Sequence, residues 1–481
     1  MTMLITGATI IDGVADKPIE GQAMLIEGNR IKAIGKHDEL PVPADATVID
    51  ATGKYVIPGL MNANVHLLVD TRPETLLRYE DRFDELIAEA AQVALKSGQT
   101  TVFDTWGPRR PLMATRDAIN AGKVVGSRIF CAGNVIGFDG PFSLDFNAPA
   151  VSMLSSRFVN RINAMWVENS GRHLMWLTPQ EVAKEVRTYI EKGIDFIKYG
   201  ANEHYGQSMG AFLSFSERVQ RVIVEEAHRA GITVQSHIMS VEGLHMAVQA
   251  GCDLITHCNI TGPREIPDET IELMVKQDCG AVIFPWSQAG LQWLRDQFEG
   301  SYSSVQKTDA NARKLIKAGA RIMLANDAGV LSPELFLEPI MKTSWMGAPE
   351  GLNFGLLATG HFVWFEAMEE KGLAPMEMLR AATRNIAVAY KKDADLGTLE
   401  PGKIADLVVL DKNPLESAKH YRTIHKVVKE GAVVDIDALP LTPLLTRQPS
   451  DPWPEEASYK HFAHSGQGSF PMCTACVISG H

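Results

Sequence analysis

The feature that most constrains this fold is a repeated pattern in which a glycine precedes a short apolar run that ends in polar residues. The pattern occurs in Gly98-Gln-Thr-Thr-Val-Phe-Asp, Gly193-Ile-Asp-Phe-Ile-Lys, Gly231-Ile-Thr-Val-Gln-Ser-His, Gly251-Cys-Asp-Leu-Ile-Thr-His and Gly319-Ala-Arg-Ile-Met-Leu-Ala-Asn-Asp. Segments with helical spacing of apolar residues separate the runs. Such alternation is typical of parallel, buried strands that are covered by helices. We therefore predict an α/β fold.

The segment 178–193 shows how one helix is delimited. Thr178 is a predicted N-cap, Glu181 completes a capping box three residues later, and Gly193 ends the helix. Its apolar residues recur every fourth position and are expected to face the sheet: Val182, Val186 and Ile190.

Both ends of the chain have a different sequence pattern, in which short runs of β-branched residues alternate with glycines that indicate turns. Residues 1–57 show it first, and residues 391–436 repeat it. A chain of 481 residues has room for a barrel of about 250 residues or more and a second unit. We predict a (β/α)8 TIM barrel over 58–390 and a small β-sandwich formed from both ends. The tail, 437–481, is rich in Pro, Ser and charge and is expected to cover the surface or to contact a neighbouring subunit.

The composition of the chain limits the classes of molecule that it is expected to bind. Hydrophobic residues make up 45% and charged residues 22%, as in ordinary globular proteins, and the net charge is −12. Nucleic acids and anionic membranes would be repelled on average, so we expect neither as a partner. No apolar stretch has the length of a membrane span, and no signal peptide is evident. We expect a cytoplasmic homo-oligomer that acts on a small molecule.

The six cysteines do not form a disulfide framework. Four lie singly in apolar segments and are expected to be buried and reduced. Cys473-Thr-Ala-Cys476, near His464 and His481, is a weak candidate for a metal or redox site, because no second CxxC accompanies it.

Polar residues that end the predicted strands form the main candidate site. They are Asn64, His66, Lys198, His237, His257 and Asp327. One histidine at the end of an apolar run is usually a structural residue. Several such residues at the carboxyl ends of barrel strands point instead to a metal centre, since burying unpaired charges costs several kcal/mol.

The order of these residues resembles the amidohydrolase superfamily. Val56-Ile-Pro-Gly-Leu-Met-Asn-Ala-Asn-Val-His66 is similar to its first-strand signature, and Asn326-Asp-Ala-Gly329 to its eighth-strand motif. Ala381-Ala-Thr-Arg-Asn385 and Gly397–Leu410 resemble the segments that close the barrel and return to the β-sandwich. The resemblance covers roughly residues 1 to 436.

The resemblance implies the roles of the strand-end residues. Lys198 would be the bridging lysine that becomes N-carboxylated, and His237 and His257 would be ligands from strands five and six. Asp327 would be a ligand and, with His257, a catalytic residue. The implied cofactor is one or two divalent metal ions, with zinc as the first choice and Co, Mn or Fe as alternatives.

The first strand departs from the superfamily pattern. It has Asn64-Val-His66 where His-X-His is usual, and an amide oxygen is a weaker donor than imidazole. We therefore predict Asn64 as a ligand of a less tightly held metal. An Asn-X-His motif is similar to that of a small branch with the phenylurea hydrolases and molinate hydrolase.

The residues predicted to contact substrate favour a neutral aromatic or alkyl group. Met239 and Phe138-Asp-Gly-Pro-Phe142 stand where related dipeptidases have groups that bind a carboxylate. The candidate wall residues are Trp106, Phe138, Phe142, Met239 and Trp286, and packing of the barrel loops explains each of them equally well. His204 and His361 are candidate carbonyl polarisers or wall residues in loops, where exposure without function is an equal alternative.

We predict metal-dependent hydrolysis of a C–N bond in a neutral amide-type or urea-type substrate. The first hypothesis is conversion of an N-aryl urea into an aniline and a carbamate. Thiocarbamate hydrolysis and deamination of an aromatic ring remain alternatives. A hypothesis of another class is a catalytically silent scaffold in which Asn64 marks a decayed metal site.

Overall fold

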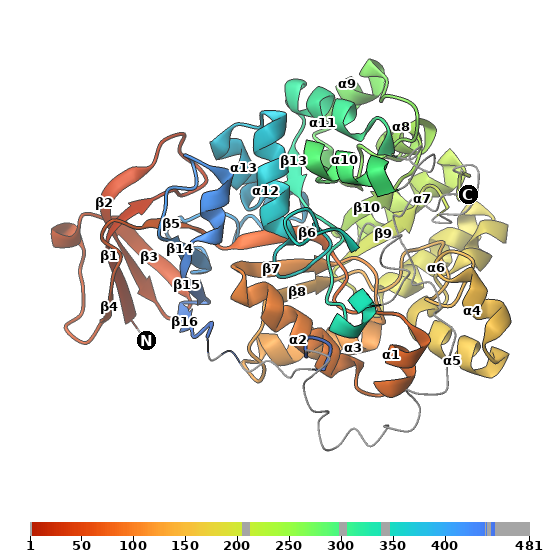
Figure 1. Cartoon of the computed structure of the whole chain (residues 1–481), viewed down its shortest axis with the longest axis horizontal. Coiled ribbons are helices and arrows are strands. Elements are labelled where there is room, and N and C mark those ends of the chain that lie inside the picture. The colour runs from red at the N-terminus through yellow and green to blue at the C-terminus, as the bar shows by residue number, and fades with distance from the viewer. Residues whose placement is uncertain are drawn as a thin grey trace.

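The computed structural model describes residues 2–203, 212–297, 305–337, 347–437, 439 and 444–447. Fourteen helices in this part of the chain surround its parallel strands (Figure 1). They are α1 (Pro73–Arg78), α2 (Phe83–Lys96), α3 (Arg109–Asn120), α4 (Ala148–Met153), α5 (Ser156–Val167), α6 (Pro179–Ile190), α7 (Glu217–Arg229), α8 (Val241–Gln249), α9 (Asp268–Lys276), α10 (Gln288–Gln297), α11 (Thr308–Lys317), α12 (Gly360–Lys371), α13 (Pro375–Ala381) and α14 (Arg384–Ala389). Short 3-10 turns include η1 (His37–Glu39), η2 (Arg172–Trp176), η4 (Pro333–Leu337) and η7 (Ala418–Arg422).

Strands from both ends of the chain share one sheet, which lies at the left of Figure 1. Its eight strands are β1 (Thr2–Ile10), β2 (Ile19–Glu27), β3 (Arg30–Gly35), β4 (Thr47–Asp50), β5 (Tyr55–Pro58), β14 (Leu407–Leu410), β15 (Ile424–Lys429) and β16 (Ala432–Val434). The order is β16-β15-β14-β5-β1-β2-β3, with β4 beside β1. The antiparallel pairing of β5 with β14 joins the two ends, as the repeated sequence pattern predicts.

The middle of the chain forms two parallel sheets. One contains β6 (Leu60–Val65), β7 (Gln99–Asp104) and β8 (Arg128–Cys131). The other contains β9 (Phe196–Gly200), β10 (Thr233–His237), β11 (Leu254–Thr256), β12 (Gly280–Ile283) and β13 (Ile322–Leu324). These strands are almost entirely buried, as Gly-preceded apolar runs between helices predict.

Single bridges connect the ends of the two sheets. Ile136 pairs in parallel with Tyr199 in β9, and Val65 in β6 pairs in parallel with Ala328, beyond β13. A buried amide, Asn62 in β6, donates hydrogen bonds to Gln99 at 2.9 Å and to Asn326 at 2.8 Å. The first and last parallel strands are therefore neighbours.

Helix α6 begins where its sequence predicts and ends at Ile190, three residues before Gly193. The Thr178 side chain accepts a hydrogen bond from the backbone N–H of Glu181, and the Glu181 carboxylate accepts one from the backbone N–H of Thr178. Val182 and Val186 are buried and Ile190 packs against the same core. This local prediction is confirmed because capping and apolar spacing both act within a few residues.

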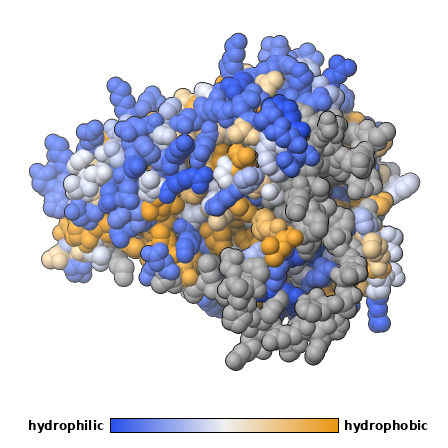
Figure 2. All heavy atoms as spheres, viewed as in Figure 1, coloured by the Kyte–Doolittle hydropathy of each residue, from blue (hydrophilic) through white to orange (hydrophobic). Residues whose placement is uncertain are grey.

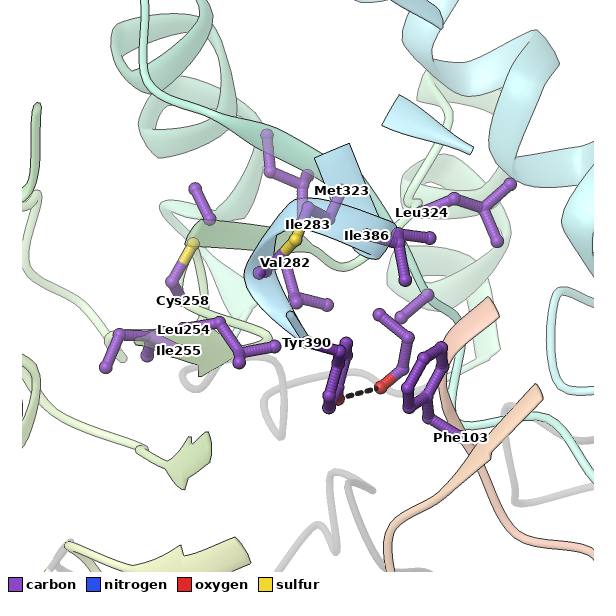
Figure 3. Close-up of a cluster of buried hydrophobic side chains, with 14 of the residues drawn as sticks. Phe103, Leu254, Ile255, Cys258, Val282, Ile283, Met323, Leu324, Ile386 and Tyr390 are labelled. Atoms are coloured by element: carbon purple, nitrogen blue, oxygen red, sulfur yellow. Dashed lines mark hydrogen bonds between the residues drawn. The ribbon is translucent and has the colours of Figure 1, made fainter. Parts of the chain in front are cut away.

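Figure 3 shows part of the buried hydrophobic core, which includes Phe103 of β7 and Tyr390. Tyr390, directly after α14, stacks on Phe103 with ring centroids 3.7 Å apart, and its hydroxyl donates to the Ala63 carbonyl at 2.8 Å. Asn64 follows Ala63, and Asp104 follows Phe103. The core therefore fixes the strand segments that carry the candidate site.

A buried arginine attaches the parallel strands to the terminal sheet. Arg128 in β8 contacts Asp406 and pairs with Glu430 at 2.6 Å. At the other end of the chain, residues 444–447 lie against α2 and η4, where Glu89 accepts hydrogen bonds from Leu444, Leu445 and Thr446 and Arg447 pairs with Glu334.

The hydropathy of the surface and the burial of the cysteines agree with what the composition predicts. On the face shown in Figure 2, hydrophilic residues cover the upper part of the molecule, and apolar residues appear in a band across the middle. No helix of the described residues is both long and apolar enough to cross a membrane. The four cysteines of the described residues, at 131, 252, 258 and 279, are buried and free, as predicted.

Candidate active site

The six strand-end residues lie along the carboxyl edges of the parallel strands. Asn64 belongs to β6, Lys198 to β9, and His237 ends β10, whereas His66 and His257 directly follow β6 and β11. Asp327 comes three residues after β13. All six are buried, from 1% exposed for Asn64 to 9% for Asp327. Buried polar groups require partners, so their contacts decide what they can do.

Asn64 connects Asp327 with β7. Its Nδ2 donates to Asp327 Oδ1, and its Oδ1 accepts from Thr105 Oγ1. The Lys198 ammonium group donates to the same Thr105 oxygen at 3.1 Å. His66 Nε2 lies 3.7 Å from Asp327 Oδ1. Residues from β6, β7, β9 and the segment after β13 therefore form one continuous set of contacts.

His237 and His257 form a second group. His237 Nδ1 and His257 Nε2 are 3.0 Å apart, and the two ring planes are nearly perpendicular. Strand register relates this pair to Lys198, because Gln235 pairs with Lys198 and His237 with Gly200, two residues further along both strands. Side chains two residues apart point to the same face of a strand. His237 therefore points to the same face of the sheet as Lys198, on the neighbouring strand.

The backbone at two site residues lies in the left-handed region. The φ angle is 38° at His257 and 50° at Asp327. Residues other than glycine rarely adopt this conformation, which costs of order 1–3 kcal/mol when the surroundings impose it. Both residues lie just beyond the strands that precede them, β11 and β13.

The donor set is chemically suited to a divalent transition metal. Imidazole nitrogens and a carboxylate are common ligands of Zn, Co, Mn and Fe, and an amide oxygen or a carbamate oxygen supplies further hard donors. His66 lies near Asp327 and His237 near His257, and in the described residues no group of three or more His, Cys, Asp or Glu side chains is placed to hold a metal ion. Metal binding at this edge therefore stays a prediction that rests on donor chemistry.

Two predicted aromatic residues lie beside the histidines. Trp106 is 6.1 Å from His66 between ring centroids and stacks on Phe146 at 4.1 Å. Phe138 is 5.4 Å from His237. Within the described residues, the buried indole N–H of Trp106 has no acceptor. This side chain thus offers an apolar face and one hydrogen-bond donor next to a site histidine.

Met239 and Trp286 belong to a separate apolar cluster, reached from His257 through Phe284. The Phe284 ring is 6.1 Å from His257 and 6.2 Å from Trp286. Phe142 packs instead against Phe158. The site therefore has aromatic groups on two sides.

Of the two remaining predicted histidines, the structure describes only His361. His204 lies outside the described residues, as do Cys473, Cys476, His464 and His481. His361 was predicted in a loop, which is wrong: it lies in α12, is fully buried, and hydrogen bonds to the Ser97 carbonyl at 3.0 Å. Ser97 precedes β7, at the strand end opposite Thr105. Burial lowers the pKa of His361 to about 3.

Several contact residues were missed by the sequence reasoning. Thr105 and Phe284 directly follow β7 and β12, so the rule applied to the other strand ends would have found them. Asp104 accepts hydrogen bonds from the backbone N–H groups of Leu67 and Trp106, and burial raises its pKa to about 8. It was passed over because its partners lie in loops, whose course the sequence does not fix.

Comparison with known proteins shows the family to which the chain belongs. The sequence matches the amidohydrolase family over residues 55–434. It is similar to the solved structure of molinate hydrolase, with 37% identity, a TM-score of 0.87, and coverage of 94% of this chain and 98% of that one. The structure of phenylurea hydrolase B is similar too, with 38% identity, a TM-score of 0.87, and coverage of 93% and 100%. Ochratoxinase of Aspergillus niger is 25% identical over 87% of this chain and 83% of its own.

Proposed function

Because this chain belongs to the amidohydrolase family and is a hydrolase of carbon–nitrogen bonds, we propose that it cleaves a neutral N-aryl urea to an aniline and a carbamate. The observation that carries the proposal is the set of buried strand-end residues around Asp327, in a chain that is 38% identical to phenylurea hydrolase B. A thiocarbamate is the second candidate substrate, because molinate hydrolase is similar to the same degree.

We further propose that the eight parallel strands close as a (β/α)8 barrel. The bridges Val65–Ala328 and Ile136–Tyr199 support closure, because they bring the outer strands of the two sheets together. In this proposal the barrel spans 58–390, and the segments 1–57 and 391–436 make the small β-sandwich. The candidate site then lies at the carboxyl end of the barrel, where barrel enzymes carry their chemistry.

The proposed ligands of a divalent ion, zinc in the first instance, are His66, His237, His257, Asp327 and an N-carboxylated Lys198. Such an ion supplies a Lewis acid for the substrate carbonyl group and makes water more acidic. The His237–His257 contact, 3.0 Å between the nitrogens, restrains both rings. Asn64, predicted as another ligand, has an amide that is already engaged by two side chains.

Asp327 carries the proton in the proposed mechanism. Its carboxylate accepts a proton from the attacking water and returns it to the leaving nitrogen, which makes an aniline a tolerable leaving group. Asn64 and His66 lie beside Asp327 Oδ1 and restrain the carboxylate. His257 is held by its contact with His237, so it faces the reacting groups in one orientation.

The proposed substrate class is inferred from the aromatic residues that lie beside the site histidines. Trp106 and Phe138 flank His66 and His237, and Phe284 connects His257 with Trp286 and Met239. These side chains suit an aryl or alkyl substituent without charge. The Trp106 indole N–H is suited to donate to a substrate oxygen or sulfur atom.

An assay of the purified protein against phenylureas, thiocarbamates and aminotriazines tests the proposal. Turnover of phenylureas with release of an aniline is expected, and exclusive turnover of thiocarbamates would transfer the proposal to the second candidate. Metal analysis of protein prepared without chelator separates an enzyme from a silent scaffold. A metal content below about a tenth of an equivalent per chain would favour the scaffold.

A further inference from the structure

Thr105, directly after β7, connects two side chains of the site, one from β6 and one from β9. Its hydroxyl lies between the Lys198 amine of β9 and the Asn64 amide of β6, and it is completely buried. Neither the family resemblance nor the ligand chemistry gave this residue a role. Its position directly after β7 places it at the same strand edge as the proposed ligands.

The chemistry of the donors fixes the direction of each hydrogen bond. Lys198 Nζ carries N–H whether it is an ammonium or the nitrogen of a carbamate, so Thr105 Oγ1 accepts from it. The single hydroxyl hydrogen of Thr105 then points to Asn64 Oδ1. With Oδ1 turned to Thr105, the NH2 group of Asn64 faces the Asp327 carboxylate, which only accepts hydrogen bonds when it is ionised.

The opposite amide orientation is unfavourable in this arrangement. It would place Asn64 Oδ1 against the Asp327 carboxylate, so that two acceptors would meet in a buried site. It would also remove Asn64 Oδ1 as the acceptor of the Thr105 hydroxyl hydrogen. Unsatisfied buried groups of this kind cost more than the hydrogen bonds themselves contribute.

We propose that Asn64 is a positioning residue that holds the Asp327 carboxylate, and that Thr105 fixes the amide orientation that makes this possible. The inference rests on the proposed role of Asp327 as proton carrier, and it replaces the ligand role predicted for Asn64. Asp327 lies three residues beyond β13 with a φ of 50°, next to Ala328, which bridges Val65 of β6. The Asn64 amide adds a side-chain contact to this backbone bridge.

Three substitutions separate positioning from metal ligation. Thr105→Val keeps the side-chain shape and removes the hydroxyl, so kcat is expected to fall by about tenfold to a hundredfold while KM stays within about threefold. Thr105→Ser keeps the hydroxyl and should retain most of kcat. Asn64→Asp cannot donate to Asp327 and adds a like charge, so it should lose activity and bind Zn2+ no more tightly than the parent.

A ligand role for Asn64 predicts the reverse result. The Asn64→Asp carboxylate would be a stronger donor to a cation than the amide, and Zn2+ affinity would rise by competition against a chelator. Tighter Zn2+ binding with retained kcat would overturn the proposal. Unchanged kcat in Thr105→Val would overturn it as well.

A thermal measurement tests the Thr105–Asn64 contact without metal or turnover. In chelator-treated protein, we compare the Tm values of Thr105→Val, Asn64→Leu and the double variant. The double variant is expected to lose less Tm than the two single losses together, because both singles break the same hydrogen bond. Additive losses would refute the contact. The cycle stays informative if the parent turns over no urea, so failure of the proposed function is recognised separately.

Discussion

Two histidines that the sequence analysis singled out have opposite surroundings. His257 directly follows a parallel strand and meets the ring of His237 across the strand edge. His361 lies in α12 and contacts only the backbone carbonyl of Ser97 through one ring nitrogen, while Nδ1 has no hydrogen-bond partner in the described residues. The first is suited to chemistry, and the second is a packed core residue.

The stability of the protein should depend on pH through His361. Burial lowers its folded pKa to about 3, below the ordinary value of 6.5, so the unfolded chain takes up this proton more readily. Stability is therefore present above pH 6.5 and is lost as pH falls towards 3. His361→Gln keeps a donor for Ser97, so its Tm should fall less than that of the parent between pH 8 and pH 5. Parallel Tm curves would contradict the assignment.

Asp327 is the residue on which the proposed reaction depends most. Asp327→Asn keeps the shape of the side chain but cannot accept a proton, so kcat should fall by about a hundredfold or more with little change in circular dichroism. Asp296→Asn, in the exposed face of α10, is the control and should keep full activity. Retained turnover in Asp327→Asn would refute the proton-carrying role.

At the scale of elements, the loops after β6 and β13 approach closely at Gly329. A Cβ at this position would lie 2.7 Å from the His66 carbonyl oxygen and 2.2 Å from Val69. The backbone oxygen cannot move without moving His66. The glycine that ends Asn326-Asp-Ala-Gly329 therefore lets the segment with Asp327 lie directly beside the one with His66.

Gly329→Ala should separate these two loops. We expect a loss of about 1–3 kcal/mol in unfolding free energy, since overpacking a close contact forces the backbone to shift. We also expect lower kcat, because His66 and Asp327 would be displaced. Gly351→Ala, where a Cβ would meet nothing within 4 Å, is the matched control. Urea unfolding and kinetics that are the same for both variants would contradict this reading of the contact.

At the scale of the whole molecule, residues 444–446 are held against helix α2, which is far away in the sequence. Glu89 of α2 accepts three backbone N–H groups from residues 444–446, and the Tyr79 hydroxyl donates to Leu444 at 3.1 Å. Burial raises the pKa of Glu89. The docked residues lie beside η4, which follows the loop of Asp327.

Glu89→Gln should destabilise the protein, because it weakens charge-assisted hydrogen bonds to a buried acceptor. A loss of about 1–3 kcal/mol in unfolding free energy at pH 8 is expected. Glu85→Gln is the matched control on the same helix, where the side chain is partly exposed and pairs with Arg82. Equal losses from the two substitutions, measured in urea, would show that the docking of 444–446 contributes nothing.

The sequence by itself determined the features that depend on near neighbours. The cap and apolar face of α6, the order of helices and strands, and the polar residues at strand ends follow from periods of two and 3.6 residues and from turn chemistry. The resemblance of four short segments gave the family, since the residues within each segment follow one another along the chain.

Only the tertiary structure decided which of these residues touch. Asn64 and Asp327 are 263 positions apart, and their contact depends on how β6 lies beside the segment after β13. The roles of Thr105, Phe284 and His361 likewise depended on loops and on helix packing. Side-chain contacts are set by register and close packing across many elements, and no local pattern of residues encodes them.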